Sequence, residues 1–467
     1  MNELEAVELR VSEVLEDTDN FRLDAEYFKK EYLELKKTIY QYPHQQLGAF
    51  SKVTDGEHGS VTFEDDGIKY LTAEHIKEGF IDISNIRYVN EEVDIRNRRA
   101  SVEVNDILLS IKGTLGEVAI ADKWLLPANM NRDVAIIKNR EKDNFLDGYI
   151  VLFLMSKIGR KLSEREGSGG VQQMITLARL RTIMIPKLTV NFQSKVSKFY
   201  QKSREKIIES KSLYEEAEEI LLKELDLLDF ELTQENIAVK SFSESFLATG
   251  RLDSEYYQPK YDEIVEKIKS YKGGFEVISN ACNLKDSNYK PSNDKYYQYI
   301  ELSNIGTTGD VTGFTYNIGK KLPSRARRLV KENDVIISSI EGSLEKVALV
   351  TEEFNDSLCS TGFYVLNSYK INSETLLVLF KNRMIQQILK QNCSGTILTG
   401  MNKDEFLNIS MPLIDLKIQT KIEQKIKTSF QLKSESKALL ELAKRAVEVV
   451  IEEGEEVALE MVGACDF

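Results

Sequence analysis

Residues 105–120 read NDILLSIKGTLGEVAI, and residues 333–350 read NDVIISSIEGSLEKVALV. With one residue inserted, residues 105–120 align with residues 333–349. Each holds two short apolar runs on either side of a glycine, a pattern typical of two strands joined by a turn. A recurrence this long indicates an internal repeat, which determines the fold and is therefore sought before single elements are assigned.

Other matches extend the repeat over nearly the whole chain. Three pairs of segments share one constant spacing: RLDAEYF (22–28) with RLDSEYY (251–257), IKYLTAEHI (68–76) with YQYIELSNI (297–305), and RNRRAS (96–101) with RARRLV (325–330). Two later pairs share a slightly shorter spacing: IPKLTVNFQ (185–193) with MPLIDLKIQ (411–419), and ESKSLYEEA (209–217) with ESKALLELA (435–443). Chance does not hold the spacing so nearly constant, so we expect two copies of one unit.

Each copy changes character once along its length. The front part holds short apolar runs with turn residues between them, such as DVAII and KVALV, which predict the strands of a mixed domain. The back part predicts a long helix after Pro186 or Pro412, because apolar or small residues recur every three or four positions. In the two copies this stripe comprises Val196, Tyr200, Ser203, Ile207, Ser210, Tyr214, Ala217 and Leu221, and Ile422, Ile426, Ser429, Ser436, Leu440, Ala443 and Val447.

The expected fold class is therefore α+β. Two similar mixed α/β domains are separated by a pair of long antiparallel coiled-coil helices, with an internal pseudo-two-fold repeat. Each helix with one apolar stripe needs a partner, and its own repeat copy can supply it. The boundaries expected are a first domain at 1–190, a helix at 191–230, a second domain at 231–415, a second helix at 416–456 and an acidic tail at 457–467.

Composition limits the classes of function. With 42% hydrophobic and 29% charged residues and no apolar run of about 18 residues, the chain is expected to be a cytoplasmic protein without a membrane span. Its first twenty residues are acidic and do not predict a signal peptide. The cysteines, Cys282, Cys359, Cys393 and Cys465, are scattered, and only three histidines occur, so neither a disulfide scaffold nor structural zinc is expected.

The net charge of −13 opposes one class of partner, nucleic acid, whose binding usually requires a basic surface. The charge is uneven, however. Acidic runs lie near residues 215–224 and 452–460, whereas arginines cluster elsewhere. A basic face on an acidic chain is therefore compatible with the sequence.

A glycine-containing loop, a proline and a glutamine seven residues later occur once in each copy. They are SGGVQQMITLARLRTIMIP (168–186) with Gln193, and SGTILTGMNKDEFLNISMP (394–412) with Gln419. Together with the order of domain, helix, domain and helix, this arrangement resembles the specificity subunits of Type I restriction-modification systems. The segment TDGEHGSVTFEDDGIKYLTAEHI (54–76) also resembles the DG-x-H segment of that family, whereas residues 283–305 keep the frame without it.

The resemblance implies a DNA-binding adaptor without catalytic activity. Each domain would be a target recognition domain for one half of a two-part site on double-stranded DNA. Two methyltransferase subunits and the restriction translocase-nuclease subunits would join it, and S-adenosylmethionine, ATP and Mg would be bound by those partners, with no cofactor in this chain. The sequence agrees, because it has no Pro-Pro step for an adenine methyltransferase loop, no G-x-x-x-x-G-K-[ST] and no H-E-x-x-H.

DNA contact calls for cationic side chains and for loops in which the backbone can approach a phosphate. The densest basic clusters are Arg96, Arg98 and Arg99, and Arg325, Arg327 and Arg328. A solvated cluster or ion pairs with Glu91, Glu92 and Asp94 would explain the first equally well. The glycine loops after the NDIL and NDVI strands add Lys112 and Gly113, and Gly342 and Ser343, with a tight hairpin as the alternative.

Base reading requires polar groups on loops, since carboxylates accept from cytosine and amides pair with adenine. The candidates that flank expected strands are Asp55, His58, Glu74, His75, Asn131 and Arg132 in the first copy, and Lys290, Asn293, Ser303 and Asn304 in the second. A histidine in such a place is more often a structural residue. Two other classes of function stay open: a tandem-domain coiled-coil scaffold that binds protein or carbohydrate, and an enzyme with an unrecognised site.

Overall fold

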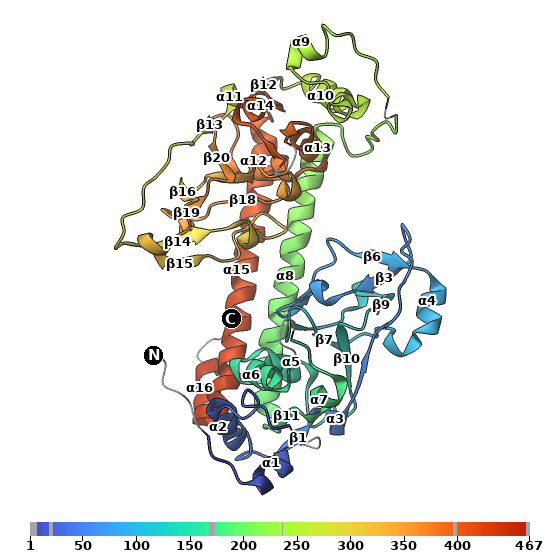
Figure 1. The fold of residues 1–467 in the computed structure, drawn as a ribbon, viewed down its shortest axis with the longest axis vertical. Helices are drawn as coiled ribbons and strands as arrows, with labels where there is room; N and C mark the ends of the chain where they lie inside the picture. Colours follow the sequence, from blue (N-terminus) through green and yellow to red (C-terminus); the bar gives the residue numbers. More distant parts are fainter. Residues whose placement is uncertain (1–6, 18–21, 168–172, 236, 396–398, 464–467) are drawn as a thin grey trace. The chain divides into compact units, whose positions relative to one another are not determined.

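The computed structural model describes residues 7–17, 22–167, 173–235, 237–395 and 399–463 (Figure 1). The chain forms two compact units. Unit 1 comprises residues 1–207 and 434–467, and unit 2 comprises residues 208–433. The long helices α8 (Val190–Glu224) and α15 (Leu416–Glu453) each contribute to both units.

Unit 1 contains a four-stranded sheet, a three-stranded sheet and two strand pairs, together with short helices. Its remaining helices are α1 Val11–Asp17, α2 Lys30–Ile39, α3 Leu47–Phe50, α4 Glu91–Arg96, α5 Asp147–Met155, α6 Lys157–Glu166, α7 Leu177–Thr182 and α16 Glu455–Gly463. Its strands are β1 His44–Gln46, β2 Ser51–Asp55, β3 Ile68–Leu71, β4 Ile76–Lys77, β5 Phe80–Ile81, β6 Arg87–Val89, β7 Ile107–Ser110, β8 Val118–Ile120, β9 Ala128–Met130, β10 Val134–Asn139 and β11 Met184–Pro186.

Unit 2 repeats this organisation. Its remaining helices are α9 Phe246–Thr249, α10 Pro259–Lys269, α11 Ile278–Ala281, α12 Ser373–Lys381, α13 Arg383–Gln391 and α14 Lys403–Leu407. Its strands are β12 Phe275–Val277, β13 Asn283–Leu284, β14 Tyr296–Ile300, β15 Thr315–Ile318, β16 Ala326–Leu329, β17 Val335–Ser338, β18 Val347–Leu349, β19 Leu358–Ser360, β20 Phe363–Asn367, β21 Cys393–Ser394, β22 Gly400–Met401 and β23 Ser410–Pro412.

The two units share most of their topology. The antiparallel sheet β2-β10-β7-β8 of unit 1 corresponds to β13-β20-β17-β18 of unit 2, and the pair β1-β11 corresponds to β12-β23. The second sheet, β6-β3-β9, corresponds to β15-β14-β19, to which unit 2 adds β16. In both, one parallel pair, β3 with β9 or β14 with β19, lies beside an antiparallel pair. The α+β class and the internal repeat are thus confirmed.

The repeated NDIL and NDVI motifs shape the same turn in both units. Asn105 and Asn333 have positive φ angles of 71° and 66°, a conformation that asparagine tolerates better than most residues. The following carboxylates, Asp106 and Asp334, are buried and accept hydrogen bonds from the backbone N–H of Glu103 and of Lys331, each at 2.8 Å. The motif therefore starts strand β7 or β17 at a fixed point.

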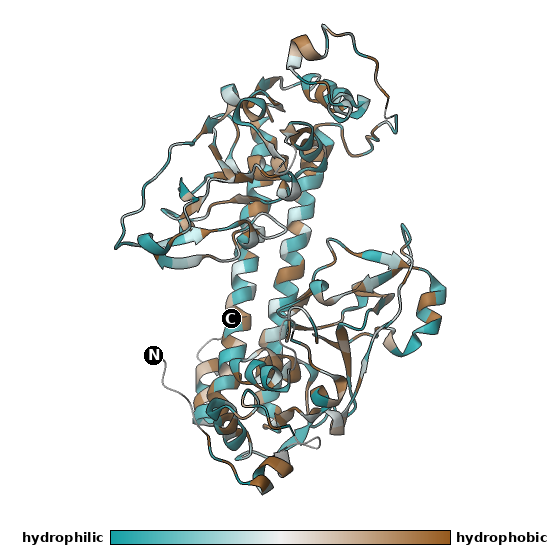
Figure 2. Cartoon of the chain, viewed as in Figure 1, coloured by the Kyte–Doolittle hydropathy of each residue, from teal (hydrophilic) through white to brown (hydrophobic). Residues whose placement is uncertain are grey.

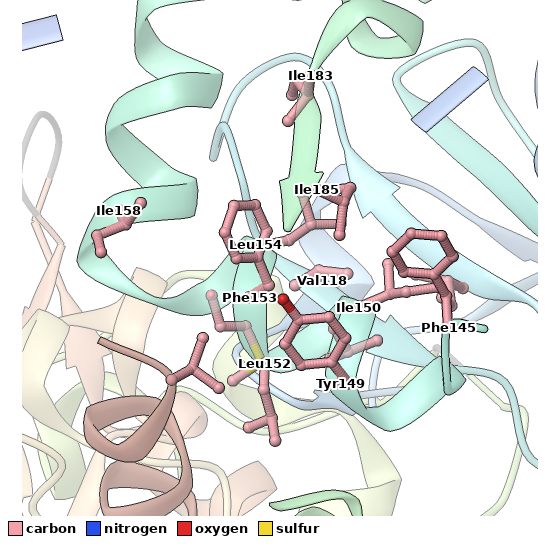
Figure 3. Close-up of a cluster of buried hydrophobic side chains, with 14 of the residues drawn as sticks. Val118, Phe145, Tyr149, Ile150, Leu152, Phe153, Leu154, Ile158, Ile183 and Ile185 are labelled. Carbon is pink, nitrogen blue, oxygen red and sulfur yellow. The ribbon is translucent and has the colours of Figure 1, made fainter. Parts of the chain in front are cut away.

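Each unit is built on one helix that is buried on all sides. In α5, residues 149–155 are all buried, and in α12 residues 374–380 are. A helix of this kind belongs in a core. Figure 3 shows Tyr149, Leu152, Phe153 and their neighbours among the buried side chains of unit 1.

The long helices pack together and run antiparallel, as expected. In unit 1 the hydroxyls of Ser203 and Ser436 lie 2.9 Å apart, and each donates to the other's backbone carbonyl. In unit 2, Ser210 and Ser429 make the same set of contacts, with the hydroxyls 3.0 Å apart. In the repeat, Ser203 of the first copy corresponds to Ser429 of the second, and Ser210 corresponds to Ser436. The two serine pairs are therefore equivalent. The small side chains permit close approach, and their hydroxyls are satisfied.

The glutamine seven residues after each proline joins the long helix to its domain. Gln193 is fully buried; its side chain accepts from the N–H of Leu146 at 2.8 Å and donates to the carbonyls of Asn144 and Leu188. Gln419 contacts three backbone groups in the same way, accepting from Asn372 and donating to the carbonyls of Lys370 and Ile414. The shift that converts Gln193 into Gln419 also relates each of these partners to its counterpart.

The helix ends differ somewhat from the sequence prediction. Helix α8 ends at Glu224 and α15 at Glu453, each before a residue with positive φ, Asp226 and Gly454. Residues 455–463, which overlap the stretch expected to be an acidic tail, form α16, whose Ala458 and Val462 are buried. In the described part of the chain, none of the helices combines the length and the apolar character needed to cross a membrane.

Candidate nucleic-acid interface

A polar cleft of about 490 Å³ opens on unit 1 where three chain segments meet. One follows strand β3, one follows β7, and one joins β9 to β10. The lining residues are Thr72, Ala73, Glu74, Lys112, Gly113, Thr114, Asn131 and Asp133. Four of them, Glu74, Lys112, Gly113 and Asn131, were predicted from sequence as DNA contacts, and the fold brings them together.

The cleft presents both hydrogen-bond donors and acceptors. The Lys112 ammonium lies 3.8 Å from Asp133, a long ion pair that leaves room for another acceptor. The Asn131 amide donates to Asp133 at 2.9 Å, and the Asp133 N–H returns a bond to the amide oxygen at 3.1 Å. Gly113 has a φ of 84°, which favours glycine there. Such a mixture suits the edges of base pairs.

The DG-x-H segment and the first arginine cluster fold together. Asp55, which is 8% exposed, pairs with His58 at 2.8 Å and with Arg99 at 3.3 Å. Arg96 pairs with Glu57 at 3.1 Å. A hydrogen bond from the N–H of Gly59, helped by Arg96, lowers the pKa of Glu57 below its usual value. Arg96 and Arg99 thus form internal ion pairs. Their partners are Glu57 and Asp55, and not the carboxylates Glu91, Glu92 and Asp94 that the sequence suggested.

Two further arginines of unit 1 that were predicted to contact DNA are exposed. Arg98 lies in the short turn after α4, and Arg132 lies beside the cleft. In the described ranges, neither side chain forms an ion pair. Arg96 and Arg99 also keep 60% and 53% of their side chains accessible. Four arginines on this face can therefore approach phosphates.

Two predicted base readers are structural in this fold. His75 is only 3% exposed, and its Nδ1 accepts from the N–H of Thr72 at 2.9 Å. Asn304, the counterpart of His75 in the second copy, accepts in the same way from the N–H of Glu301 at 2.8 Å. Both close a turn after a strand. Their neighbours Glu74 and Ser303 are exposed and better placed for a ligand.

Unit 2 presents different residues at corresponding places. Lys290 and Asn293 lie exposed on the loop before β14, and Arg325 lies exposed before β16. On that strand, Arg327 donates to the carbonyl of Ser324, and Arg328 to the side chain of Asn288. The second arginine cluster is therefore on a strand, whereas the first is on a helix end and a turn.

The glycine loop of unit 2 is also accessible. Gly342 is exposed, and a Cβ there would have no atom within 4 Å. The Ser343 hydroxyl lies 2.9 Å from that of Ser338. In each unit, one isolated β-bridge joins the glycine loop after the NDIL or NDVI strand to the glycine-containing loop that precedes the long helix. The bridge pairs Lys112 with Met174 in unit 1 and Ile340 with Gly400 in unit 2. Residues 168–172 and 396–398 of the family-like motifs lie outside the described residues.

Sequence reasoning missed several surface groups. Thr72, Thr114 and Asp133 of the cleft adjoin residues that were selected, so a wider window on the same loops would have found them. In unit 2, Tyr296 and Tyr316 are 56% and 63% exposed and stack with ring centroids 5.2 Å apart. In the described residues, no three His, Cys, Asp or Glu side chains gather as metal ligands.

Residues 61–219 match the family described as the Type I restriction modification DNA specificity domain. The chain thus resembles the Type I restriction-modification specificity subunits. The resemblance supports a role in DNA specificity rather than in catalysis.

Two specificity subunits show the extent of the similarity. The chain is 20% identical over 419 residues to the MjaVIII specificity subunit of Methanocaldococcus jannaschii, covering 86% of this chain and 90% of that protein. It is 24% identical over 131 residues to the EcoBI specificity subunit of Escherichia coli, covering 28% of this chain and 27% of that protein. Solved structures with detectable similarity include the S subunit from M. genitalium, at 14% identity and a TM-score of 0.43, covering 90% of this chain and 96% of that one. Another is the HsdS subunit from Thermoanaerobacter tengcongensis, at 11% identity and a TM-score of 0.28, covering 88% of this chain and 97% of that one.

Proposed function

We propose that this specificity subunit recognises a DNA target of two half-sites, one for each unit, and directs methyltransferase and restriction subunits to it. The observation that carries the proposal is the repeated topology with different surface residues. Strand β3 with its turn corresponds to β14, yet the exposed groups around them differ in kind. One framework with two surfaces suits the reading of two unlike sequences.

The residues proposed to contact DNA divide into two kinds. The exposed cations of unit 1, Arg98, Arg132 and the outer faces of Arg96 and Arg99, suit phosphates, which fix position without reading sequence. Lys112, Asn131 and Glu74 lie in the cleft and suit base edges. In unit 2, Lys290, Asn293, Ser303, Arg325 and the loop at Gly342 take these roles.

The chemistry is proposed to belong to the partners. Two methyltransferase subunits would carry S-adenosylmethionine, and the translocase-nuclease subunits would use ATP and Mg. This chain would position those subunits on the DNA. The net charge of −13 is a sum over the whole chain, whereas the exposed cations named above would attract phosphates locally.

The decisive experiment purifies the chain with the methyltransferase subunit and measures binding to genomic DNA fragments against salt, followed by sequencing of methylated DNA. We expect a single two-part motif, and an affinity that falls steeply as salt rises because counterions are released from phosphates. Binding that ignores salt, or the absence of a methylated motif, would instead favour the tandem-domain scaffold for protein or carbohydrate.

A further inference from the structure

The hairpin of β14 and β15 in unit 2 carries a group of exposed aromatic rings. Tyr296 on β14 and Tyr316 on β15 are 56% and 63% exposed, and their rings stack with centroids 5.2 Å apart. Phe314, just before β15, is 39% exposed and meets the ring of Tyr316 edge-on. Single exposed aromatic residues are common on protein surfaces, but a group of them on neighbouring strands marks a contact surface.

The strand register places the two tyrosines on the same face of the hairpin. Tyr316 lies opposite Gln298, which is two residues after Tyr296 on the same strand. Opposite residues, and residues two apart on one strand, point to the same side of a sheet. On the other side, Tyr297 and Tyr299 are buried. The exposed rings therefore stand on a strand pair whose opposite face is packed against unit 2.

Cations without a carboxylate partner flank this hairpin. Residues 288–297 and 314–328, which we name the basic aromatic patch, hold seven lysines and arginines and one carboxylate, that of Asp294. Across the described part of the chain, none of the seven forms an ion pair. They are Lys290, Lys295, Lys320, Lys321, Arg325, Arg327 and Arg328. In unit 1, by contrast, Arg96 and Arg99 pair with carboxylates, so the positive charge of the patch is the less neutralised of the two.

Backbone hydrogen bonds hold the parts of the patch together. The N–H of Lys320 donates to the carbonyl of Asn293 at 3.1 Å, and the N–H of Tyr289 donates to the carbonyl of Arg327 at 2.7 Å. One loop, the one before β14, thus touches both the turn after β15 and strand β16. The turn after β15 is teal in Figure 2, the colour of hydrophilic residues. The cations and the aromatic rings therefore belong to one surface.

This combination of groups identifies the kind of partner. Cations that have no carboxylate beside them attract phosphates. Apolar rings among them call for an apolar group on the DNA, and in the major groove that group is the C5-methyl of thymine. Insertion between base pairs suits the tyrosines less well, because their ring centroids are 5.2 Å apart whereas neighbouring base pairs are about 3.4 Å apart.

We propose that the basic aromatic patch is the surface with which unit 2 holds its half-site, with the cations on phosphates and with Tyr296 and Tyr316 against the methyl group of a thymine. The inference rests on the proposed function and adds an apolar base contact to it. The half-site that unit 2 reads must then contain an A·T pair.

The first test measures binding of the full chain, in complex with its methyltransferase subunit, to a duplex that carries the methylated motif. Each thymine of the motif is replaced in turn by deoxyuridine, which removes only the methyl group. We expect one replacement to weaken binding by the wild type roughly fourfold, the effect of one buried methyl group. A variant with Tyr296→Ala and Tyr316→Ala should bind the unmodified duplex at least that much more weakly, and the same replacement should not weaken it further.

A matched control for the tyrosines is Tyr369→Ala, whose side chain is 101% exposed in unit 2 outside the patch. This control should respond to deoxyuridine as the wild type does. All variants should melt as the wild type does and should keep the methyltransferase subunit.

The second test follows affinity against salt concentration. Replacement of both Lys320 and Lys321 by glutamine should make log affinity fall less steeply with log salt, with a slope smaller by about 1–2, since each phosphate contact contributes about 0.9. Replacement of both Lys417 and Lys421 by glutamine removes the same charge from exposed positions of α15 in the same unit. This control should keep the wild-type slope.

The possible outcomes separate the two proposals. Binding that deoxyuridine weakens at none of the positions would overturn the thymine contact, and so would an equal effect on the wild type and on the tyrosine variant. An unchanged salt slope in the variant of Lys320 and Lys321 would overturn the phosphate contacts. A tyrosine variant that loses the methyltransferase subunit would make a protein the occupant. A wild-type complex that binds no motif at all would instead refute the proposed function.

Discussion

At the scale of single residues, Lys112 occupies an informative place. Its side chain is 30% exposed and lines the cleft of unit 1, and its ammonium has Asp133 as a distant partner at 3.8 Å. A cation held this loosely keeps its hydrogen-bonding capacity for a ligand. Arg132, next to the cleft and exposed, is in a similar position.

We therefore expect Lys112→Ala to relax recognition of one half-site and to leave the other unchanged, and Arg132→Ala to weaken binding at the same half-site without changing its sequence preference. A good base contact contributes about 1–3 kcal/mol, so tenfold or larger effects are expected. Sequencing of methylated DNA gives the readout for each half. Lys195→Ala, at an exposed position of α8, is the control and should change neither half. An equal loss on both halves would assign Lys112 to structure or to general phosphate binding.

Sequence alone selected Glu74, Lys112 and Asn131, which meet in the cleft, because polar residues that follow strands tend to reach one edge of a sheet. It also selected His75 and Asn304, which cap turns. A side chain that caps a turn and a side chain that contacts DNA are both polar and both follow a strand. Only the folded structure distinguishes the two roles. The partners of Arg96 and Arg99 were beyond sequence reasoning for a similar reason: Glu57 and Asp55 lie far from them in the sequence and reach them through the fold.

At the scale of elements, the connection between each long helix and its domain depends on one buried amide. Gln193 satisfies a backbone N–H and two carbonyls that have no water to replace it. A buried polar group that loses its partner costs about 1–3 kcal/mol. The connection of the helix to its domain therefore depends on this side chain in addition to the apolar stripe.

The variant Gln193→Ala should lower the free energy of unfolding of unit 1 by about 2–4 kcal/mol, since several backbone groups lose their partner together. Urea unfolding followed by circular dichroism measures the change. Gln201→Ala, at an exposed position on the same helix, should change it by no more than about 0.5 kcal/mol. Similar losses in both variants would contradict the role assigned to Gln193.

A second element contact involves a lysine with an unusual pKa. Burial at the end of α12, with Lys346 nearby, lowers the pKa of Lys381 to about 8. Burial in the same region raises the pKa of Glu218 on α8. Because the folded state holds the proton of Lys381 less strongly than the unfolded chain, its charge opposes folding fully below pH 8. The cost then fades as the pH rises from 8 toward 10.5.

Replacement of Lys381 by methionine should therefore stabilise unit 2 at pH 7. We expect about 1–2 kcal/mol, since the side chain is partly exposed and solvent screens its charge. The difference from wild type should shrink between pH 8 and 10.5. Urea titrations at pH 7, 8.5 and 10 measure it, and a difference that is constant with pH would exclude the titration of Lys381 as its cause.

At the scale of the whole molecule, the repeat explains what the sequence could predict. A nearly constant spacing implied two copies of one topology, and the two larger sheets of unit 1 recur in unit 2. Local differences escaped prediction. The segment RNRRAS of unit 1 forms the end of α4 and a short turn, whereas the related segment RARRLV of unit 2 forms strand β16, which pairs with β19. Strand β9, the counterpart of β19, has no such neighbour in the sheet of unit 1.

The helix pair also provides a test of how the spacing between half-sites is set. Four residues inserted between Ser203 and Ser210, and four between Ser429 and Ser436, leave both serine pairs intact and lengthen each helix by roughly 6 Å. If the helices set the distance, the methylated motif should gain one or two base pairs between unchanged half-sites. Sequencing of methylated DNA from cells carrying the variant decides this, and an active variant with the original spacer would show that the helices do not measure the distance.

The two serine pairs have a further consequence. Because the shift between the repeat copies converts one pair into the other, the surface of α8 that faces α15 is complementary to itself. A chain of half the length, carrying one domain and one long helix, would pair with its own copy, with Ser203 opposite Ser210 of the second molecule. Such a homodimer would carry two identical recognition surfaces and would therefore read a palindrome. The present chain joins the two halves covalently, and this leaves each half free to diverge, so that its target need not be symmetric.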